Sequence, residues 1–334
     1  MSNASSEPTR TPLVSVLVCT YNAGPYLRPA VLSLLEQVYT GIEIVIVDDG
    51  SDDGCIETIA DLKDARIKLV RQENRGKAGA LNRGVAESRG ELFAIQDADD
   101  LSHPQRIAKQ VALMLEHPDL AAVFCGHELI LDGKHRAPRA RAHDRAECRR
   151  IVARMGMPAH DPTAMYRRAL VKDLRFEPVE PAEGLDFIIR VGEKLPMMVL
   201  GECLYSYRIS AGSATRQDAE RRFENVLSVY ARACARRGLP ESMKSHFFND
   251  PWLLGRNRVR DHNLPAHFME SCIDLCRSGQ RLEAARTALV CSALRPFDLH
   301  YHKALLYSLL PAGVVKRLRR TVKRHEAMAN GFPL

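Results

Sequence analysis

The first third of the chain alternates between short apolar runs and stretches with helical spacing, and this alternation constrains the fold more than any other feature. The apolar runs are residues 13–19, 42–47, 67–70 and 91–96, and the helical stretches are residues 26–37, 53–62, 77–88 and the segment after Ser102. Strands of a parallel sheet are apolar on both sides because helices cover both faces. The alternation therefore predicts an α/β fold with a doubly wound, mostly parallel sheet and helices on both faces.

A polar loop follows each of the four apolar runs, at the end of the strand where such sheets bind ligands. The loops are residues 20–26, 48–54, 71–80 and 97–100. Any one of them is also explained by ordinary turn chemistry. Four in order, with acidic and small residues at the strand ends, predict that the loops converge on one binding site.

The last of these loops places Asp97, Asp99 and Asp100 within four residues of one another, directly after an apolar run. Carboxylates this close repel one another and lose hydration at the edge of the core, so their pKa values rise unless a cation offsets them. Mg²⁺ usually takes only one or two protein carboxylates and fills its other positions with water and phosphate oxygens. The Asp-x-Asp pattern therefore predicts a metal-nucleotide site.

An acidic turn followed by a helix cap is the alternative for this stretch. Ser102 and Gln105 have the spacing of a capping box. The helix predicted after them carries an apolar stripe formed by Ile107, Val111, Met114 and Leu115. Capping requires Ser102, but it does not require three aspartates before it.

Asp48 and Asp49 follow the second apolar run, where they can accept hydrogen bonds from a nucleobase N–H and a ribose hydroxyl. Gly50 and Ser51 suit a tight turn there, and turn chemistry alone is again the alternative. The chain has no Gly-x-Gly-x-x-Gly after its first run and no P-loop motif. A nicotinamide cofactor and a P-loop nucleotide site are therefore both disfavoured.

The nine cysteines are scattered and include no Cys-x-x-Cys pair, which argues against a disulfide framework or a structural zinc site. We expect most of them to be small buried apolar side chains. No apolar run reaches the length of a membrane span, and residues 1–10 lack the apolar core of a signal peptide. The sequence therefore predicts a cytoplasmic protein.

The net charge of +7 is concentrated in two places. Residues 134–154 hold eight Lys or Arg residues against two acids, and residues 313–325 form a second basic cluster. Either cluster suits a phosphate-bearing or anionic-lipid partner, and a solvated helical face is the alternative. Aromatic residues make up only 6% of the chain and no nucleic-acid-binding motif is present, so we expect no nucleic-acid partner.

Six segments in combination resemble the family 2 glycosyltransferases of the GT-A fold. They are residues 14–22, 42–53, 73–100, 160–168, 182–190 and 205–215. The resemblance implies a nucleotide-sugar donor, most often a UDP-sugar, a Mn²⁺ or Mg²⁺ ion at the Asp-x-Asp motif, and transfer with inversion to a glycan or lipid-linked acceptor. It implies that the nucleoside is bound by Thr20, Tyr21, Asn22 and Asp49 with Asp48 beside them, that Lys77 and Asn82 face the donor, and that Asp97, Asp99 and Asp100 hold the ribose, the diphosphate and the metal.

The chain departs from the family pattern at the position of the catalytic base. The pattern usually has an aspartate where Gly184 stands, and glycine has no side chain to accept a proton. Glu183, one residue away, is the first candidate for the base and Asp186 is the second. An i, i+4 ion pair with Arg190 is the alternative for Asp186.

Two further positions bear on the resemblance. Many relatives have a histidine where Ser210 stands, and that histidine can help to hold the metal or the diphosphate. His160 matches a common family histidine; a core histidine or a supporting hydrogen-bonding group is the alternative.

These observations predict three regions. They are a disordered segment at 1–11, a GT-A catalytic domain at 12–216 with a nucleotide-sugar half at 12–101 and an acceptor half at 102–216, and a helical region at 217–334. Residues 269–296 have the pattern of a helical hairpin, which predicts a cap or a partner surface. The tail suits peripheral contact with an anionic membrane at its inner face, with ordinary packing as the alternative. A homodimer is left open.

Two other functions remain. The first is a sugar-nucleotide-binding scaffold that has lost its base, as Gly184 would allow. The second is a nucleotidyltransferase, which normally has a basic, glycine-rich first loop that residues 20–26 do not provide.

Overall fold

The computed structural model describes residues 11–131, 133–208, 219–240, 271–272, 275–276, 279–294, 302, 305 and 308–310. The chain forms two compact units, which are treated separately below. The first comprises residues 1–135 and 140–257, and the second comprises 136–139 and 258–334.

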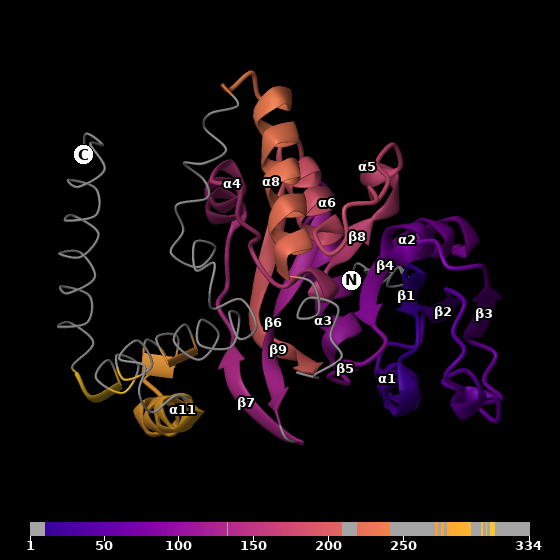
Figure 1. Ribbon diagram of the computed structural model, residues 1–334, viewed down its shortest axis with the longest axis horizontal. Coiled ribbons are helices and arrows are strands. Elements are labelled where there is room, and N and C mark those ends of the chain that lie inside the picture. Colours follow the sequence, from indigo (N-terminus) through magenta and orange to yellow (C-terminus); the bar gives the residue numbers. More distant parts are fainter. Residues whose placement is uncertain are drawn as a thin grey trace, which may run out of the picture. The chain divides into compact units, whose positions relative to one another are not determined.

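One sheet of nine strands runs through the described part of the chain (Figure 1). The strands are β1 (Val14–Thr20), β2 (Ile42–Asp48), β3 (Ile67–Arg71), β4 (Leu92–Asp97), β5 (Leu101–Ser102), β6 (Ala122–Leu131), β7 (Lys134–Arg139), β8 (Met165–Arg167) and β9 (Met197–Arg208). Their order is β3-β2-β1-β4-β8-β6-β9-β5, and β7 pairs with β6. β3, β2, β1 and β4 are parallel neighbours, whereas β8 runs antiparallel to both β4 and β6.

Helices cover both faces of this sheet. The helices of the first unit are η1 (Gly24–Tyr26), α1 (Leu27–Leu35), η2 (Glu57–Ile59), α2 (Gly76–Glu87), α3 (Arg106–Glu116), α4 (Arg145–Ala153), η3 (Asp161–Thr163), α5 (Arg168–Val171), α6 (Glu183–Gly192) and α8 (Ala219–Arg236), and the second unit contains α11 (Arg281–Leu294). The predicted fold class, an α/β sheet of the doubly wound type with helical structure after it, is confirmed.

Alternate residues of each central strand face different helices, which explains why the strands are apolar throughout. Val16 and Val18 of β1 pack in the cluster that includes α1, η2 and α3, whereas Leu17 between them packs in the cluster that includes α2, α4 and α6. Figure 1 shows α1 and α2 on opposite sides of β1 and β2. The core therefore has two layers, one on each side of the sheet.

Three local predictions were wrong. Residues 53–62 do not form an α-helix: the segment contains only the 3₁₀ turn η2, and Gly54 before it has φ of +78°. Ser102 does not cap α3, because it lies in β5 and pairs with β9, and Gln105 occupies the N-cap position. Leu115 does not join the buried stripe of α3, because it is 41% exposed.

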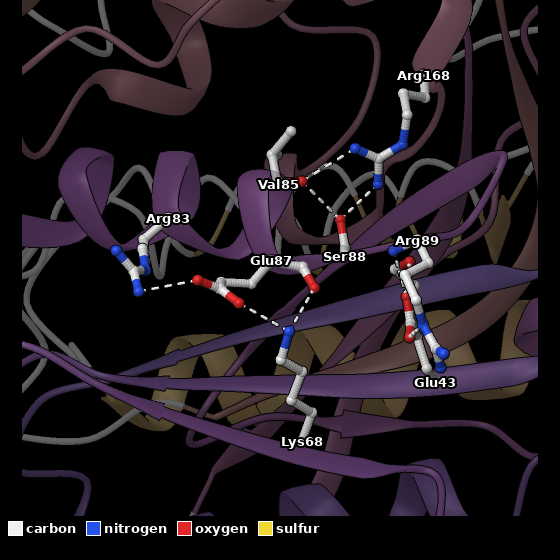
Figure 2. A network of polar contacts seen from close by, with 9 residues as sticks. Glu43, Lys68, Arg83, Val85, Glu87, Ser88, Arg89 and Arg168 are labelled. Carbon is white, nitrogen blue, oxygen red and sulfur yellow. Dashed lines mark hydrogen bonds and ion pairs between the residues drawn. The ribbon is translucent and has the colours of Figure 1, made fainter.

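A polar network closes the edge of the sheet at which β2 and β3 begin (Figure 2). The buried carboxylate of Glu43 accepts hydrogen bonds from the Ser15 hydroxyl and from the backbone N–H and Nε of Arg89. Burial opposes the charge of Glu43, but these hydrogen bonds outweigh it and lower its pKa. Lys68 pairs with Glu87 at 2.7 Å nearby. This edge is committed to structural contacts, which leaves the opposite edge for a ligand.

Helix α8 packs against α6 in the first unit (Figure 1). Val229 and Ala233 of α8 are fully buried in the cluster that also contains Ile189 of α6. The first compact unit thus extends beyond residue 216, where we predicted the catalytic domain to end.

In the second unit, α11 packs its Ala284 against Leu275 and Cys276, as a helical hairpin requires. Residues 1–10, Ser210 and the basic tail at 313–325 lie outside the described residues. The eight cysteines within the described residues form no disulfide with one another, and six of them are buried, as predicted. Within the described ranges, none of the helices combines the length and apolar character needed to cross a bilayer.

Candidate functional site

The carboxyl ends of β1, β2 and β4 bring the predicted donor residues to one edge of the sheet. The parallel register places Thr20 of β1 opposite Asp48 of β2, and Cys19 of β1 opposite Asp97 of β4. Burial first, and then the charges of Asp97 and Asp49, raise the pKa of the Cys19 thiol. Side chains from three strands therefore share one electrostatic environment, as the loop pattern predicted.

Hydrogen bonds join the loop after β1 to the loop after β2. The Asn22 side chain accepts from the backbone N–H of Asp52 at 3.0 Å, and the Asn22 N–H donates to the Ser51 hydroxyl at 3.1 Å. Asn22 has φ of +52°, a left-handed conformation that asparagine tolerates better than most residues. The Gly24 N–H donates to Asp53 at 2.7 Å. These bonds make a preformed rim, beyond which Tyr21 is 56% exposed.

Asp48 and Asp49 are both buried at this edge. The Asp48 carboxylate accepts from the Ser51 N–H at 2.9 Å. The Asp49 carboxylate accepts from Gln72 Nε2 at 2.7 Å and from the Arg75 N–H at 2.9 Å through its Oδ1. Both of these hydrogen bonds end on Oδ1 of Asp49, so its second carboxylate oxygen can accept a further donor.

Lys77 links the Asp-x-Asp motif to the beginning of α6. Its Nζ lies 2.8 Å from Asp97 Oδ1 and 3.7 Å from Glu183 Oε1. Burial opposes the ammonium charge, but Asp97, Asp161 and Glu183 outweigh it and raise the pKa of Lys77 well above its ordinary value. Lys77 is therefore a permanent cation between the Asp-x-Asp motif and the beginning of α6.

Asp99 is the carboxylate of the motif that fits a metal best. It is partly exposed, and burial together with the charge of Asp97 raises its pKa to about 6. A divalent cation would remove this penalty. No group of three or more His, Cys, Asp or Glu side chains within the described ranges is arranged to hold a metal ion. The residues thus fit an ion bound by one or two carboxylates and completed by a diphosphate.

Asp100 is fully buried, and its Oδ1 accepts the Arg208 N–H at 2.7 Å. This bond ties the motif to the end of β9. Burial, and then the charge of Asp99, raise the Asp100 pKa well above its ordinary value. Asp100 Oδ2 is buried without a hydrogen-bond partner. Metal binding by Asp100 stays a prediction, and of the two proposed ligands Asp99 is the more accessible.

Two predicted residues are already committed to structural contacts. The Asn82 side chain donates to Phe176 O at 2.8 Å and accepts from the Phe176 N–H at 3.0 Å, so its amide holds the chain before α6. The Asp186 carboxylate is 1% exposed and pairs with Arg190 at 2.7 Å and with Arg232 at 3.3 Å. The i, i+4 ion pair considered for Asp186 is therefore present.

His160 lies in an aromatic cluster next to the site. Its ring centroid is 4.9 Å from that of His127 and 4.6 Å from that of Tyr207, and its side chain is 23% exposed. A ligand role for His160 stays a prediction, as do the alternatives of a core histidine and a supporting hydrogen-bonding group.

The sequence reasoning missed Arg106, which is fully buried beneath the site and uses all three nitrogens of its guanidinium. Two of its bonds go to the strand β4, at Ile95 O (2.8 Å) and Gln96 Oε1 (3.1 Å), and one goes to Pro162 O (2.9 Å). Ser102 Oγ and Gln110 Oε1 accept the rest. Helical spacing gave no sign of this role, because it depends on residues far apart in the chain.

Arg208 and Tyr205 of β9 were also missed. Arg208 Nε donates to Asp99 O at 2.8 Å, and the Tyr205 hydroxyl accepts the Asp97 N–H at 3.1 Å. Both residues lie in a segment that the family resemblance included, and this was the only available signal.

Glu183 gives the site a measurable pH dependence of stability. Burial is the main cause that raises the pKa of Glu183 from 4.5 to about 7. The charge of Lys77 lowers this pKa, and the charge of Asp161 raises it further. The folded state therefore retains a proton between these pH values that the unfolded state has lost, so Glu183 lowers the free energy of unfolding as pH rises through this range. Above pH 7 this shift of the Glu183 pKa lowers the free energy of unfolding by about 3 kcal/mol.

We expect Glu183→Gln to unfold at a higher temperature than the parent at pH 8 and to differ little from it at pH 4.5, as measured by thermal denaturation. Glu116→Gln, at a side chain that is 71% exposed, is the control and should show no such divergence. Equal stability of the parent and Glu183→Gln across the range would contradict the raised pKa.

Comparison with known proteins agrees with this geometry. Residues 15–175 match the model of Glycosyl transferase family 2. An uncharacterized glycosyltransferase of Rickettsia typhi is 40% identical over 129 residues, which is 38% of this chain and 40% of the relative. One from Nostoc sp. is 39% identical over 124 residues, or 36% of this chain and 38% of the relative. The chain thus spans about two fifths of the length of these relatives.

Solved structures share the fold over nearly the whole chain. S. aureus TarS 1–349 in complex with UDP-GlcNAc has a TM-score of 0.59 at 20% identity and covers 92% of each chain. Mannosyltransferase PcManGT from Pyrobaculum calidifontis, in complex with GDP-Man and Mn²⁺, has a TM-score of 0.57 at 23% identity, with 95% of this chain and 90% of that one covered. The strand order and this likeness show a GT-A-type fold, and residues 15–175 within it match glycosyl transferase family 2.

Proposed function

We propose that this protein is an inverting, metal-dependent glycosyltransferase that moves a sugar from a nucleoside-diphosphate donor to a hydroxyl of a glycan or glycolipid. The observation that carries the proposal is the convergence of Asp48, Asp49, Lys77, Asp97 and Asp99 at one edge of the sheet of a family 2 domain. A UDP-sugar is the favoured donor, because TarS, which has a similar fold, was solved with UDP-GlcNAc. GDP-sugars are tested as well, because PcManGT was solved with GDP-Man.

The donor half of the site has the groups that a nucleotide sugar needs. Asp49 retains one carboxylate oxygen for the nucleoside, and Tyr21 is exposed at the rim, where a base could stack on it. Asp99 would hold a Mn²⁺ or Mg²⁺ ion together with the diphosphate. When bound, such an ion neutralises charge on the departing diphosphate and so stabilises the transition state. Lys77 adds a fixed positive charge beside Asp97.

The acceptor half must supply a base. Single inversion requires a carboxylate on the face of the sugar opposite the leaving diphosphate, where it removes the proton of the acceptor hydroxyl. Glu183 begins α6 next to Lys77, and its Oε2 is buried without a hydrogen-bond partner. The candidate bases therefore lie around the first turn of α6.

The basic run at 134–154 is the candidate surface for an acidic or phosphate-bearing acceptor. Part of its charge is already paired: Arg145 lies 2.7 Å from Asp119, and Glu147 pairs with Arg150. The remaining positive charge supports the glycan or lipid-linked class of acceptor without identifying it.

Binding of UDP, GDP, CDP, dTDP and ADP, each with Mn²⁺ and again with EDTA, tests the donor half. We expect one nucleotide to raise the melting temperature in Mn²⁺ and to lose this effect in EDTA. A ligand present at a hundred times its dissociation constant adds about 2.7 kcal/mol to the free energy of unfolding. If none of the nucleotides shifts the melting temperature, or if EDTA leaves the shift unchanged, the result would contradict metal-dependent donor binding.

A binding scaffold is the second candidate, and Gly184 is the observation that favours it, because it lacks the side chain that relatives use as a base. Both candidates bind the donor. Release of the nucleoside diphosphate from the sugar nucleotide separates them: a transferase turns over the donor slowly with water as acceptor, and a scaffold leaves it intact.

A further inference from the structure

The space next to Gly184 is filled by the carboxylate of Asp161. A Cβ built on Gly184 would lie 2.3 Å from Asp161 Oδ2 and 2.7 Å from its Cγ, far inside normal contact distances. Gly184 is the position at which the family pattern has its base. The side chain missing from α6 is therefore matched by a carboxylate that reaches the same place from another element.

The chain around Asp161 is held rigidly. Asp161 begins the 3₁₀ turn η3, and the next two carbonyl groups accept hydrogen bonds from buried side chains of α3. Arg106 Nη2 donates to Pro162 O at 2.9 Å, and Gln110 Nε2 donates to Thr163 O at 2.8 Å. A side chain on such a turn is positioned before substrate binds, as catalysis requires.

Of the three carboxylates around the first turn of α6, Asp161 is the most accessible. Its side chain is 25% exposed, compared with 6% for Glu183 and 1% for Asp186. Asp186 is held by two arginines, and Glu183 lies 3.7 Å from Lys77 with its Oε2 buried. The charge of Asp161 contributes to the raised pKa of Lys77, which places it in the same site as the Asp97–Lys77 pair.

We propose that Asp161 is the catalytic base of this protein and that it replaces the carboxylate which Gly184 cannot provide. A carboxylate oxygen of Asp161 takes the proton of the acceptor hydroxyl. The hydroxyl oxygen forms the new bond to the anomeric carbon with its electron pair, and the bond from that carbon to the diphosphate breaks, its electrons leaving with the nucleoside diphosphate. Glycine at 184 is then required, because any side chain there would displace Asp161.

This inference rests on the proposed function, so its test uses the full chain, Mn²⁺ and the donor that the parent turns over, chosen between UDP-N-acetylglucosamine and GDP-mannose. The assay measures release of the nucleoside diphosphate with water as acceptor, and nucleotide binding is measured separately by thermal shift. If the parent protein binds nucleotide but turns over neither donor, the result would contradict both the proposed transferase activity and the proposed role of Asp161 as its base.

We expect Asp161→Asn to lower turnover by about 10²- to 10⁴-fold, the usual contribution of a general base, while nucleotide binding and melting temperature remain those of the parent. Gly184→Ala should produce a similar loss, because its Cβ occupies the space of Asp161 Oδ2. The two changes act on one group, so the double variant should be no worse than Asp161→Asn alone. Asp119→Asn, at an exposed side chain that pairs with Arg145, is the matched control.

A relocation variant separates a base from a structural side chain. Asp161→Gly combined with Gly184→Asp moves the carboxylate to α6 and relieves the overlap, so it should recover turnover at least tenfold relative to Asp161→Gly. A purely structural Asp161 would not be rescued in this way. The proposal would be overturned if Asp161→Asn kept its turnover within threefold of the parent while Glu183→Gln lost most of its turnover. Glu183 would then be the base.

Discussion

Asp99→Asn is expected to remove the effect of Mn²⁺ on nucleotide binding and to lower donor turnover on the order of 10³-fold. Charge neutralisation by a metal supplies several kcal/mol in the transition state, and each factor of ten in rate requires about 1.4 kcal/mol. Asparagine retains the size of the side chain but not its charge. Because the Asp99 pKa is raised to about 6 by burial and by Asp97, the protein without metal should become slightly more stable, not less.

Two measurements check this expectation. Thermal shift with UDP or GDP should respond to EDTA in the parent but not in Asp99→Asn, and release of nucleoside diphosphate gives the rate. Asp119→Asn again serves as the control, since Asp119 precedes β6 at the opposite edge of the sheet. A variant that keeps both its EDTA response and its rate would show that Asp99 does not bind the metal.

Arg106→Met is expected to lower the free energy of unfolding by about 4 kcal/mol, a large effect for a single substitution. Methionine fills a similar volume but donates no hydrogen bonds, so the buried acceptors at Ile95, Gln96 and Pro162 lose their partner. Each unsatisfied buried polar group costs about 1–3 kcal/mol, although the costs do not add fully. For a domain of this size the melting temperature should fall by about 10 °C.

Arg106 also joins the strand before the Asp-x-Asp motif to the turn that carries Asp161, so donor turnover should fall together with stability. Arg28→Met is the matched control: Arg28 is a partly exposed arginine paired with Asp61, and its loss should cost less than about 1 kcal/mol. Thermal and urea denaturation of both variants give the comparison. Equal stability of the two variants would show that the hydrogen bonds of Arg106 contribute nothing net.

The strand ends illustrate how much of the site follows from local sequence. Thr20, Asp48 and Asp97 follow apolar runs, and a parallel sheet requires neighbouring runs to end at one edge. Their convergence could therefore be predicted without coordinates. Asp186 could also be interpreted correctly, because an ion pair with Arg190 depends only on helical spacing.

Local pattern was insufficient where two structures compete for the same residues. Residues 53–62 have helical spacing, yet Gly54 and the capping of Cys55 by Asp53 start a short 3₁₀ turn, whose Ile56 and Ile59 are already buried against the sheet. Ser102 has the spacing of a helix cap, but pairing of β5 with β9 takes it into the sheet. In both places tertiary contacts outweighed a weak local preference.

The sequence by itself determined the α/β architecture, the edge of the sheet at which the strand-end loops converge and the acidic character of that edge, because these follow from periodicity and strand ends. Only the tertiary structure decided that Arg106 is buried with hydrogen bonds from all three guanidinium nitrogens, and that Asp161 occupies the space beside Gly184. The physical reason is that both facts are distances between residues from separate elements. Such distances depend on how the helices pack on the sheet, and hydrophobic spacing within any one element does not contain them.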